Sequence, residues 1–112
     1  MKRFASVLEI RAERIAEYKR LHRNVWPGVR EMIQECNIHN FSIYLRQFPD
    51  GRYYLFSYFE YTGNDYDADA ARLAADETTQ KWWEACRPAQ KPFDGLPQGQ
   101  WWAEMEEVFR CE

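Results

Sequence analysis

The residues best suited to chemistry in this chain lie in one stretch, Glu17–Pro27, which reads EYKRLHRNVWP. Within it, Tyr18 and His22 are four residues apart in a pattern typical of a helix, so their side chains lie one turn apart on the same face. An imidazole with a pKa near neutrality can both accept and donate a proton, and the phenol beside it can donate a hydrogen bond. The pair is therefore the first candidate for a functional site.

The face that carries Tyr18 and His22 is also the apolar face of the predicted helix. Its apolar residues recur with helical spacing at Ile15, Tyr18, Val25, Trp26, Val29, Met32, Ile33 and Cys36. A phenol and an imidazole that point inward need hydrogen-bond partners, which either the core or a ligand must provide. A single histidine on an apolar face is more often structural, so both interpretations are kept at this point.

The hydrophobic periodicity predicts the elements that position this pair. The expected strands are Phe4–Ile10, Ile38–Arg46, Tyr53–Glu60 and a last one within Trp101–Arg110, and the expected helices are 12–36, 65–75 and 76–86. Pro27 predicts a break near Asn24–Trp26, because proline disfavours helical geometry in the residue before it. Asp50-Gly51 predicts a hairpin turn, and Asp76 is expected to cap the third helix. The three prolines of Arg87–Gln100 predict a surface loop.

The order β-α-β-β-α-β predicts an α+β fold, the ferredoxin-like arrangement, in a single domain over residues 1–112. Such a fold has helices on one face of its sheet and leaves the other face open. We expect Phe41, Ile43 and Leu45 on the open face, where a second subunit would cover them, and hence a homodimer. Tyr44, with Asn40 and Ser42, should then face the helices and line a site for a polar ligand.

Two tryptophan pairs are candidates for the walls of such a site. Trp82 and Trp83 point about 100° apart on a helix, so we expect Trp82 in the core and Trp83 at its edge, where the ring can form a wall. Packing by both rings is an equally good interpretation of the spacing alone. For Trp101-Trp102 we prefer the simpler interpretation, in which the two rings pack on opposite faces of an edge strand.

Composition narrows the functional classes. The net charge of -3 provides no basic surface for nucleic acid, and no apolar run is long enough to span a membrane. Asp65, Asp67 and Asp69 do not form a calcium loop, because Ala70 stands where glycine is needed, and the sequence has neither zinc-ligand spacing nor a phosphate-binding glycine loop. An odd number of cysteines, three, and the lack of a signal peptide after Met1 predict reduced thiols and a cytoplasmic location.

Five segments together resemble the L-rhamnose mutarotase family in register over nearly the whole chain. They are Tyr18-x-x-x-His22, Val25-Trp26-Pro27, Asn40-Phe41-Ser42-Ile43-Tyr44-Leu45, Gln80-Lys81-Trp82-Trp83 and Glu106-Glu107-Val108-Phe109. The resemblance implies a dimeric α+β barrel that interconverts the α and β anomers of a 6-deoxy-L-hexose, L-rhamnose first, without cofactor or metal. It also implies that His22 is the catalytic proton donor and that Tyr18, Tyr44, Trp82 and Trp83 contact the sugar.

Other functions remain as alternatives. The segment Arg87–Pro92 and the longer loop into Trp102 depart from the best-known rhamnose enzymes and are similar to relatives that act on sugars such as L-fucose. A non-catalytic dimeric sensor of a small metabolite would need the same pocket. A cofactor-free monooxygenase or heme-degrading protein on this fold would bind a hydrophobic substrate, and the polar strand positions argue against it.

Overall fold

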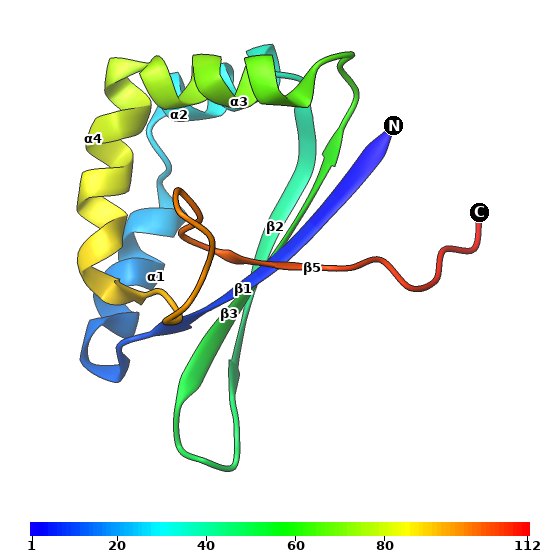
Figure 1. Ribbon diagram of the computed structural model, residues 1–112. Helices are drawn as coiled ribbons and strands as arrows, with labels where there is room; N and C mark the ends of the chain where they lie inside the picture. The colour runs from blue at the N-terminus through cyan, green and yellow to red at the C-terminus, as the bar shows by residue number, and fades with distance from the viewer.

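The helices of this protein all lie on one side of an antiparallel sheet (Figure 1). The computed structural model describes all 112 residues. Its strands are β1 (Lys2–Ile10), β2 (Ile38–Gln47), β3 (Tyr53–Tyr61), β4 (Gln90–Lys91) and β5 (Ala103–Met105). Its helices are α1 (Ile15–Arg23), α2 (Pro27–Glu35), α3 (Tyr66–Ala75) and α4 (Glu77–Cys86), with short 3₁₀ turns at Ala12–Arg14 and Arg87–Ala89. None of the helices is long and apolar enough to cross a membrane.

The sheet has the strand order β2-β3-β1-β4, and β5 pairs with β1. The long strands β1 and β3 pair antiparallel over their full lengths, from Lys2 opposite Tyr61 to Ile10 opposite Tyr53. Both β4 and β5 lie antiparallel to β1: β4 pairs with Glu9 and Ile10 at its C-terminal end, and β5 pairs with Ala5–Val7 in its middle. This order confirms the ferredoxin-like α+β fold expected from the sequence of elements.

Pro27 divides the first long helical pattern in two, as predicted. The chain leaves α1 at Asn24, whose φ is -136°, and Trp26 has an extended ψ of 133° before Pro27 opens α2. Proline fits the first position of a helix, because its missing N–H would have had no partner there. Asp65 and Asp76 cap α3 and α4 by accepting bonds from the N–H groups of Ala68 and Thr79, at 3.1 and 3.0 Å.

The core lies between the sheet and α1, α2 and α4. Its buried residues are Leu8, Ile10, Tyr18, Val29, Leu55, Trp82, Cys86 and Ala89. Alternate residues of β1 and β3 contribute to it, since Leu8 lies opposite Leu55 on the face that the helices cover.

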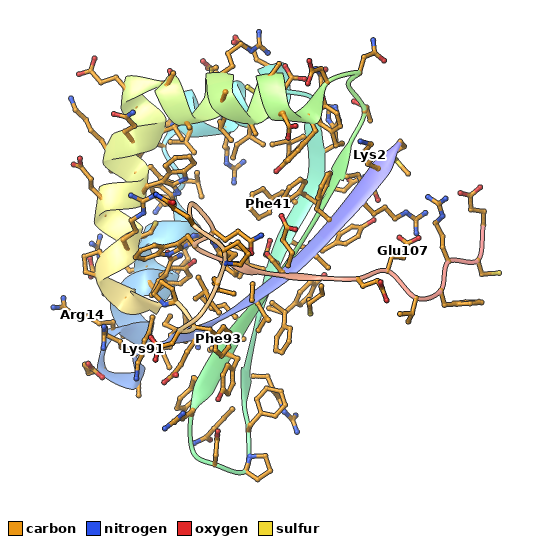
Figure 2. All side chains as sticks on the ribbon, in the orientation of Figure 1. Lys2, Arg14, Phe41, Lys91, Phe93 and Glu107 are labelled. Atoms are coloured by element: carbon orange, nitrogen blue, oxygen red, sulfur yellow. The ribbon has the colours of Figure 1, made fainter.

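The predicted assignment of the two faces of β2 is wrong. Leu45 pairs with the buried Leu55, and Ile43 pairs with the buried Ser57, so Phe41, Ile43 and Leu45 are on the side of the helices. Figure 2 shows Phe41 pointing into the space between the sheet and the helices. Tyr44 pairs with Phe56 on the open face and is 62% exposed. The period of two was correct, but alternation alone does not say which set faces inward. The register of β2 also shifts at a bulge between His39 and Ser42.

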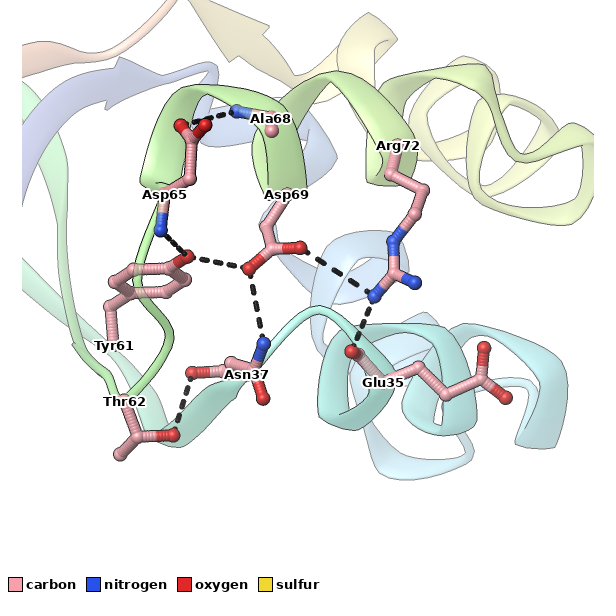
Figure 3. A network of polar contacts seen from close by, with 8 residues as sticks. All are labelled: Glu35, Asn37, Tyr61, Thr62, Asp65, Ala68, Asp69 and Arg72. Carbon is pink, nitrogen blue, oxygen red and sulfur yellow. Dashed lines mark hydrogen bonds and ion pairs between the residues drawn. The ribbon is translucent and has the colours of Figure 1, made fainter.

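A polar network fixes α3 to the ends of β3 and α2 (Figure 3). The Asp69 carboxylate accepts hydrogen bonds from the Tyr61 hydroxyl at 2.5 Å and from the Asn37 amide at 3.0 Å. Arg72 donates to the Glu35 carbonyl, and the Asp65 N–H donates to the Tyr61 oxygen. Asn37 has a φ of 65°, a conformation that asparagine tolerates better than most residues. These hydrogen bonds lower the pKa of Asp69, because they favour its charged form.

Candidate functional site

A groove of about 1570 Å³ lies between the helices and the sheet. It exceeds the roughly 300–1,000 Å³ that is common for small-ligand pockets, so one monosaccharide would fill only part of it. Of the five residues that the sequence singled out, Tyr18, His22, Trp82 and Trp83 line this groove. Tyr44 does not line it, because Tyr44 projects from the opposite face of the sheet.

Tyr18 and His22 are in contact, as their spacing on α1 predicts. Their rings stack with centroids 4.2 Å apart, and His22 Nδ1 lies 2.8 Å from the Tyr18 carbonyl oxygen. A carbonyl oxygen can only accept a hydrogen bond, so Nδ1 must carry the proton. The neutral imidazole therefore has its lone pair on Nε2, which is the nitrogen left to exchange a proton with a ligand.

Burial sets the charge states of this pair. It lowers the pKa of His22 below 6.5, because an imidazolium is disfavoured away from water, although the hydrogen bond to the Tyr18 carbonyl opposes part of the shift. Burial also raises the pKa of Tyr18 to about 12, and a hydrogen bond from Gln90 partly opposes that effect. Near neutral pH, the site therefore combines a proton acceptor on His22 with a phenol that keeps its proton.

The predicted division between the adjacent tryptophans of α4 is confirmed. Trp82 is 7% exposed, and its ring makes edge contacts with His22 at 5.1 Å and with Trp26 at 5.2 Å. Trp83 is only partly buried and lines the groove. The Arg87 guanidinium lies 5.4 Å from the centre of the Trp83 ring and 5.1 Å from that of Trp101, at distances typical of cation–π contacts.

Gln90 and Phe41 line the groove without having been predicted there, and Trp101 and Trp102 lie elsewhere than predicted. Trp101 and Trp102 are in a bend before β5, and both line the groove, so the prediction of packing on opposite faces of a strand is wrong. Two tryptophans in a proline-rich loop were a usable signal, since such rings are rarely left on a surface. Gln90 carried no signal, because nothing in a local pattern shows that its side chain meets Tyr18.

The arrangement suits acid–base exchange on a small, polar molecule. Of the 39 residues that line the groove, 23 are apolar or aromatic, and polar or charged side chains such as Arg30, Ser42 and Gln90 make up most of the rest. A ligand would therefore meet both apolar walls and hydrogen-bonding groups. Flat indole rings can cover C–H surfaces of a ligand. The Tyr18 hydroxyl can donate a hydrogen bond to a polar group of the ligand, and Nε2 of His22 can accept one.

The chain is similar in sequence to a known family of enzymes. A sequence model of the L-rhamnose mutarotase family matches residues 3–111. The chain is 35% identical over 92 residues to the L-rhamnose mutarotase of Bacillus subtilis (strain 168), covering 81% of this chain and 82% of that protein. It is 34% identical over 115 residues to that of Opitutus terrae (strain DSM 11246 / JCM 15787 / PB90-1), over the whole of both chains.

A solved structure shares the fold over its full length. The crystal structure of the L-rhamnose mutarotase FA22100 from Formosa agariphila superposes with a TM-score of 0.74. The alignment covers 100% of both chains at 21% sequence identity. This likeness confirms the fold that the strand order indicates.

Proposed function

This chain belongs to the L-rhamnose mutarotase family, and we propose that it interconverts the α and β anomers of L-rhamnose in the groove between its helices and its sheet. The observation that carries the proposal is the pairing of His22 with Tyr18, which leaves one unprotonated ring nitrogen beside a protonated phenol. Mutarotation uses both functions, because the anomeric hydroxyl must lose its proton to a base while a hydrogen bond stabilises the charge that develops on the ring oxygen.

The proposed reaction follows from these protonation states. Nε2 of the neutral His22 takes the proton of the anomeric hydroxyl as the bond between C1 and the ring oxygen breaks. The ring oxygen receives its proton from the solvent side, with a hydrogen bond from Tyr18 stabilising its developing charge. Rotation about the C1–C2 bond presents the other face of the aldehyde. When the ring closes, the protonated His22 is the donor that returns a proton to the carbonyl oxygen, and the hydroxyl that attacks C1 releases its proton to the solvent.

The tryptophans give this site a preference for a 6-deoxy sugar. Trp82 closes the groove behind His22, and Trp83 forms a wall that can receive the C6 methyl group together with the C–H face of the ring. Tyr44 is outside this set within one subunit, so its predicted contact with the sugar requires a second subunit. Such a contact stays a prediction.

The function is tested by exchange NMR, which measures how fast each sugar passes between its anomers. We expect the protein to accelerate L-rhamnose most and L-fucose second, because a hydroxyl of wrong stereochemistry leaves a site group unpaired at a cost of about 1–3 kcal/mol. D-Glucose and D-galactose serve as controls. Faster exchange of either control than of both deoxy sugars contradicts the assignment, and binding of L-rhamnose without any acceleration supports the sensor instead.

The pH dependence of exchange should show the role of His22 in ring opening. Since the pKa of His22 is lowered from 6.5, the neutral base still predominates at pH 6.5. After subtraction of the uncatalysed rate, kcat/KM should be near its maximum at neutral pH and fall at acidic pH as the imidazole becomes protonated, with a midpoint below that of an ordinary histidine. A rate that rises as the pH falls below 6.5 contradicts this role and assigns His22 as the first proton donor.

We also propose that the protein is a homodimer that pairs the open faces of two sheets. The apolar surface that would be covered in the dimer is not the one expected from the sequence, because Phe41, Ile43 and Leu45 face the helices. The open face instead has an apolar hollow of about 460 Å³, lined by Val7, Phe48, Pro49, Asp50, Tyr54, Phe56 and Phe93. The C-terminal tail, which leaves the body of the molecule in Figure 1, exposes 86% of Val108 and 80% of Phe109. A lone subunit would expose all of this apolar surface.

Light scattering measures the oligomeric state directly. We expect a mass of twice 13.6 kDa for the wild type, and a shift towards the monomer for Phe56→Arg, which places a charge in the open face. Glu84→Arg introduces the same residue on the exposed side of α4 and should leave the dimer intact. A wild-type monomer at micromolar concentration contradicts the proposal.

A further inference from the structure

The Gln90 side chain is a buried amide with both of its ends paired. It is 8% exposed and begins β4, where its backbone lies opposite Ile10 of β1. The Trp101 indole N–H donates to its oxygen at 2.7 Å, and its NH₂ group donates to the Tyr18 hydroxyl oxygen at 3.1 Å. Burying an amide without partners costs free energy, so these two hydrogen bonds explain how the group is accommodated beside the groove.

Trp101 fixes the orientation of this amide. An indole N–H can only donate, so the Gln90 atom that faces it must be the oxygen. The NH₂ group is then the end that faces Tyr18, and the Tyr18 oxygen accepts a hydrogen bond. Because Gln90 has no acceptor on that side, the proton of the Tyr18 hydroxyl points elsewhere, towards other partners.

We propose that Gln90 is a positioning residue for the mutarotase reaction, holding the Tyr18 hydroxyl as a donor to the sugar under the control of Trp101. The proposal rests on the proposed function and adds to it a residue that does not touch the reacting atoms. Without Trp101, the amide is free to turn its oxygen to Tyr18 and accept the hydrogen bond that Tyr18 would otherwise donate to the sugar.

The segment between α4 and β5 thereby gains a role. It carries both Gln90 and Trp101, and the Arg87 guanidinium lies between the rings of Trp101 and Trp83. Trp83 belongs to the wall of the groove, so one set of contacts links this wall to the residue that orients Tyr18. The segment 87–102 thus sets the donor direction in the site, in addition to covering it.

Three variants test the proposal against one control in exchange NMR with L-rhamnose. Gln90→Met keeps the length of the side chain without its polar atoms, and it should lower kcat about tenfold, the effect of one misdirected hydrogen bond. Gln90→Glu should lower kcat at neutral pH to a similar extent, since a carboxylate accepts the Tyr18 proton. Trp101→Phe should show a smaller fall. The control Gln98→Met, at an exposed position of the same segment, should match the wild type.

Two readouts separate positioning from a merely structural role. In Gln90→Glu, the ratio of variant to wild-type rate should rise as the pH falls, because the protonated carboxyl can donate to Tyr18 as the amide does. The ¹³C resonance of Tyr18 Cζ, assigned with Tyr18→Phe, should shift in Gln90→Met and Trp101→Phe but not in Gln98→Met. Thermal melts identify the variants that are folded.

The outcomes are distinct. A folded Gln90→Met variant with wild-type kcat and KM overturns the proposal, as does an unchanged Tyr18 resonance in both Gln90→Met and Trp101→Phe. If the wild type accelerates no sugar, the proposed function fails, while the Tyr18 resonance still tests the hydrogen-bond arrangement. If the wild type accelerates exchange and the Gln90 variants do so at the same rate, the proposed function is supported and the role of Gln90 is contradicted.

Discussion

Replacing His22 with alanine is expected to lower the rate of anomer exchange by about 10²–10⁴-fold, the usual contribution of a general acid–base group. The change removes the only imidazole of the groove that stacks on Tyr18 and presents a free ring nitrogen. L-Rhamnose should still bind, because Tyr18 and the tryptophan wall remain in place. Exchange NMR measures the rate, and calorimetry measures the binding.

The control for this variant is His39→Ala. His39 is the other histidine of the chain; it is exposed at the start of β2 and also borders the groove, but it stands on the sheet and not on α1 beside Tyr18. Its removal should leave the rate near that of the wild type. Tyr18→Phe should lower the rate less than His22→Ala, because it removes one hydroxyl and keeps the ring that packs on His22. A folded His22→Ala protein with the wild-type rate would contradict the proposed role of His22 in proton transfer, and Tyr18 would become the next candidate.

The second large effect is expected on stability, from Gly63→Ala. A β-carbon at Gly63 would overlap with the Tyr61 hydroxyl oxygen and lie 2.6 Å from Tyr61 Cζ and 2.8 Å from Asp69 Oδ2. The variant must therefore move the tyrosine ring or the carboxylate that holds α3 to β3. Overpacking of this kind costs about 1–3 kcal/mol, so the melting temperature should fall by at least several degrees.

A matched substitution and a double variant make this result specific. Gly28→Ala, in α2, places a β-carbon 3.3 Å from a methyl group of Thr78 and should change stability little. Tyr61→Phe removes the oxygen atom that the new methyl group would meet. In the double variant Gly63→Ala/Tyr61→Phe, the two losses should therefore be less than additive. Additive losses, or an unchanged melting temperature in Gly63→Ala, contradict the steric explanation.

Much of the site could be predicted because its two central residues, Tyr18 and His22, are close together in the sequence. Tyr18 and His22 lie one helical turn apart, so their contact depends only on the formation of α1, which its periodicity predicts. The inward direction of the pair also followed from that periodicity. In the same way, adjacent positions on α4 explain why Trp82 is buried while Trp83 remains at the edge.

The amino-acid sequence by itself determined the order of the long elements, the break at Pro27 and the cap at Asp76, because each depends on neighbouring residues. It predicted a surface loop over Arg87–Gln100, where the structure has the short strand β4 (Gln90–Lys91) paired with β1. Only the tertiary structure decided which face of β2 meets the helices, since both faces carry aromatic or apolar side chains and the bulge at 39–42 changes the register. It also decided that Gln90 meets Tyr18, 72 residues away along the chain. A hydrogen bond over that separation depends on how β4 and the following loop fold back onto α1, which no local pattern encodes.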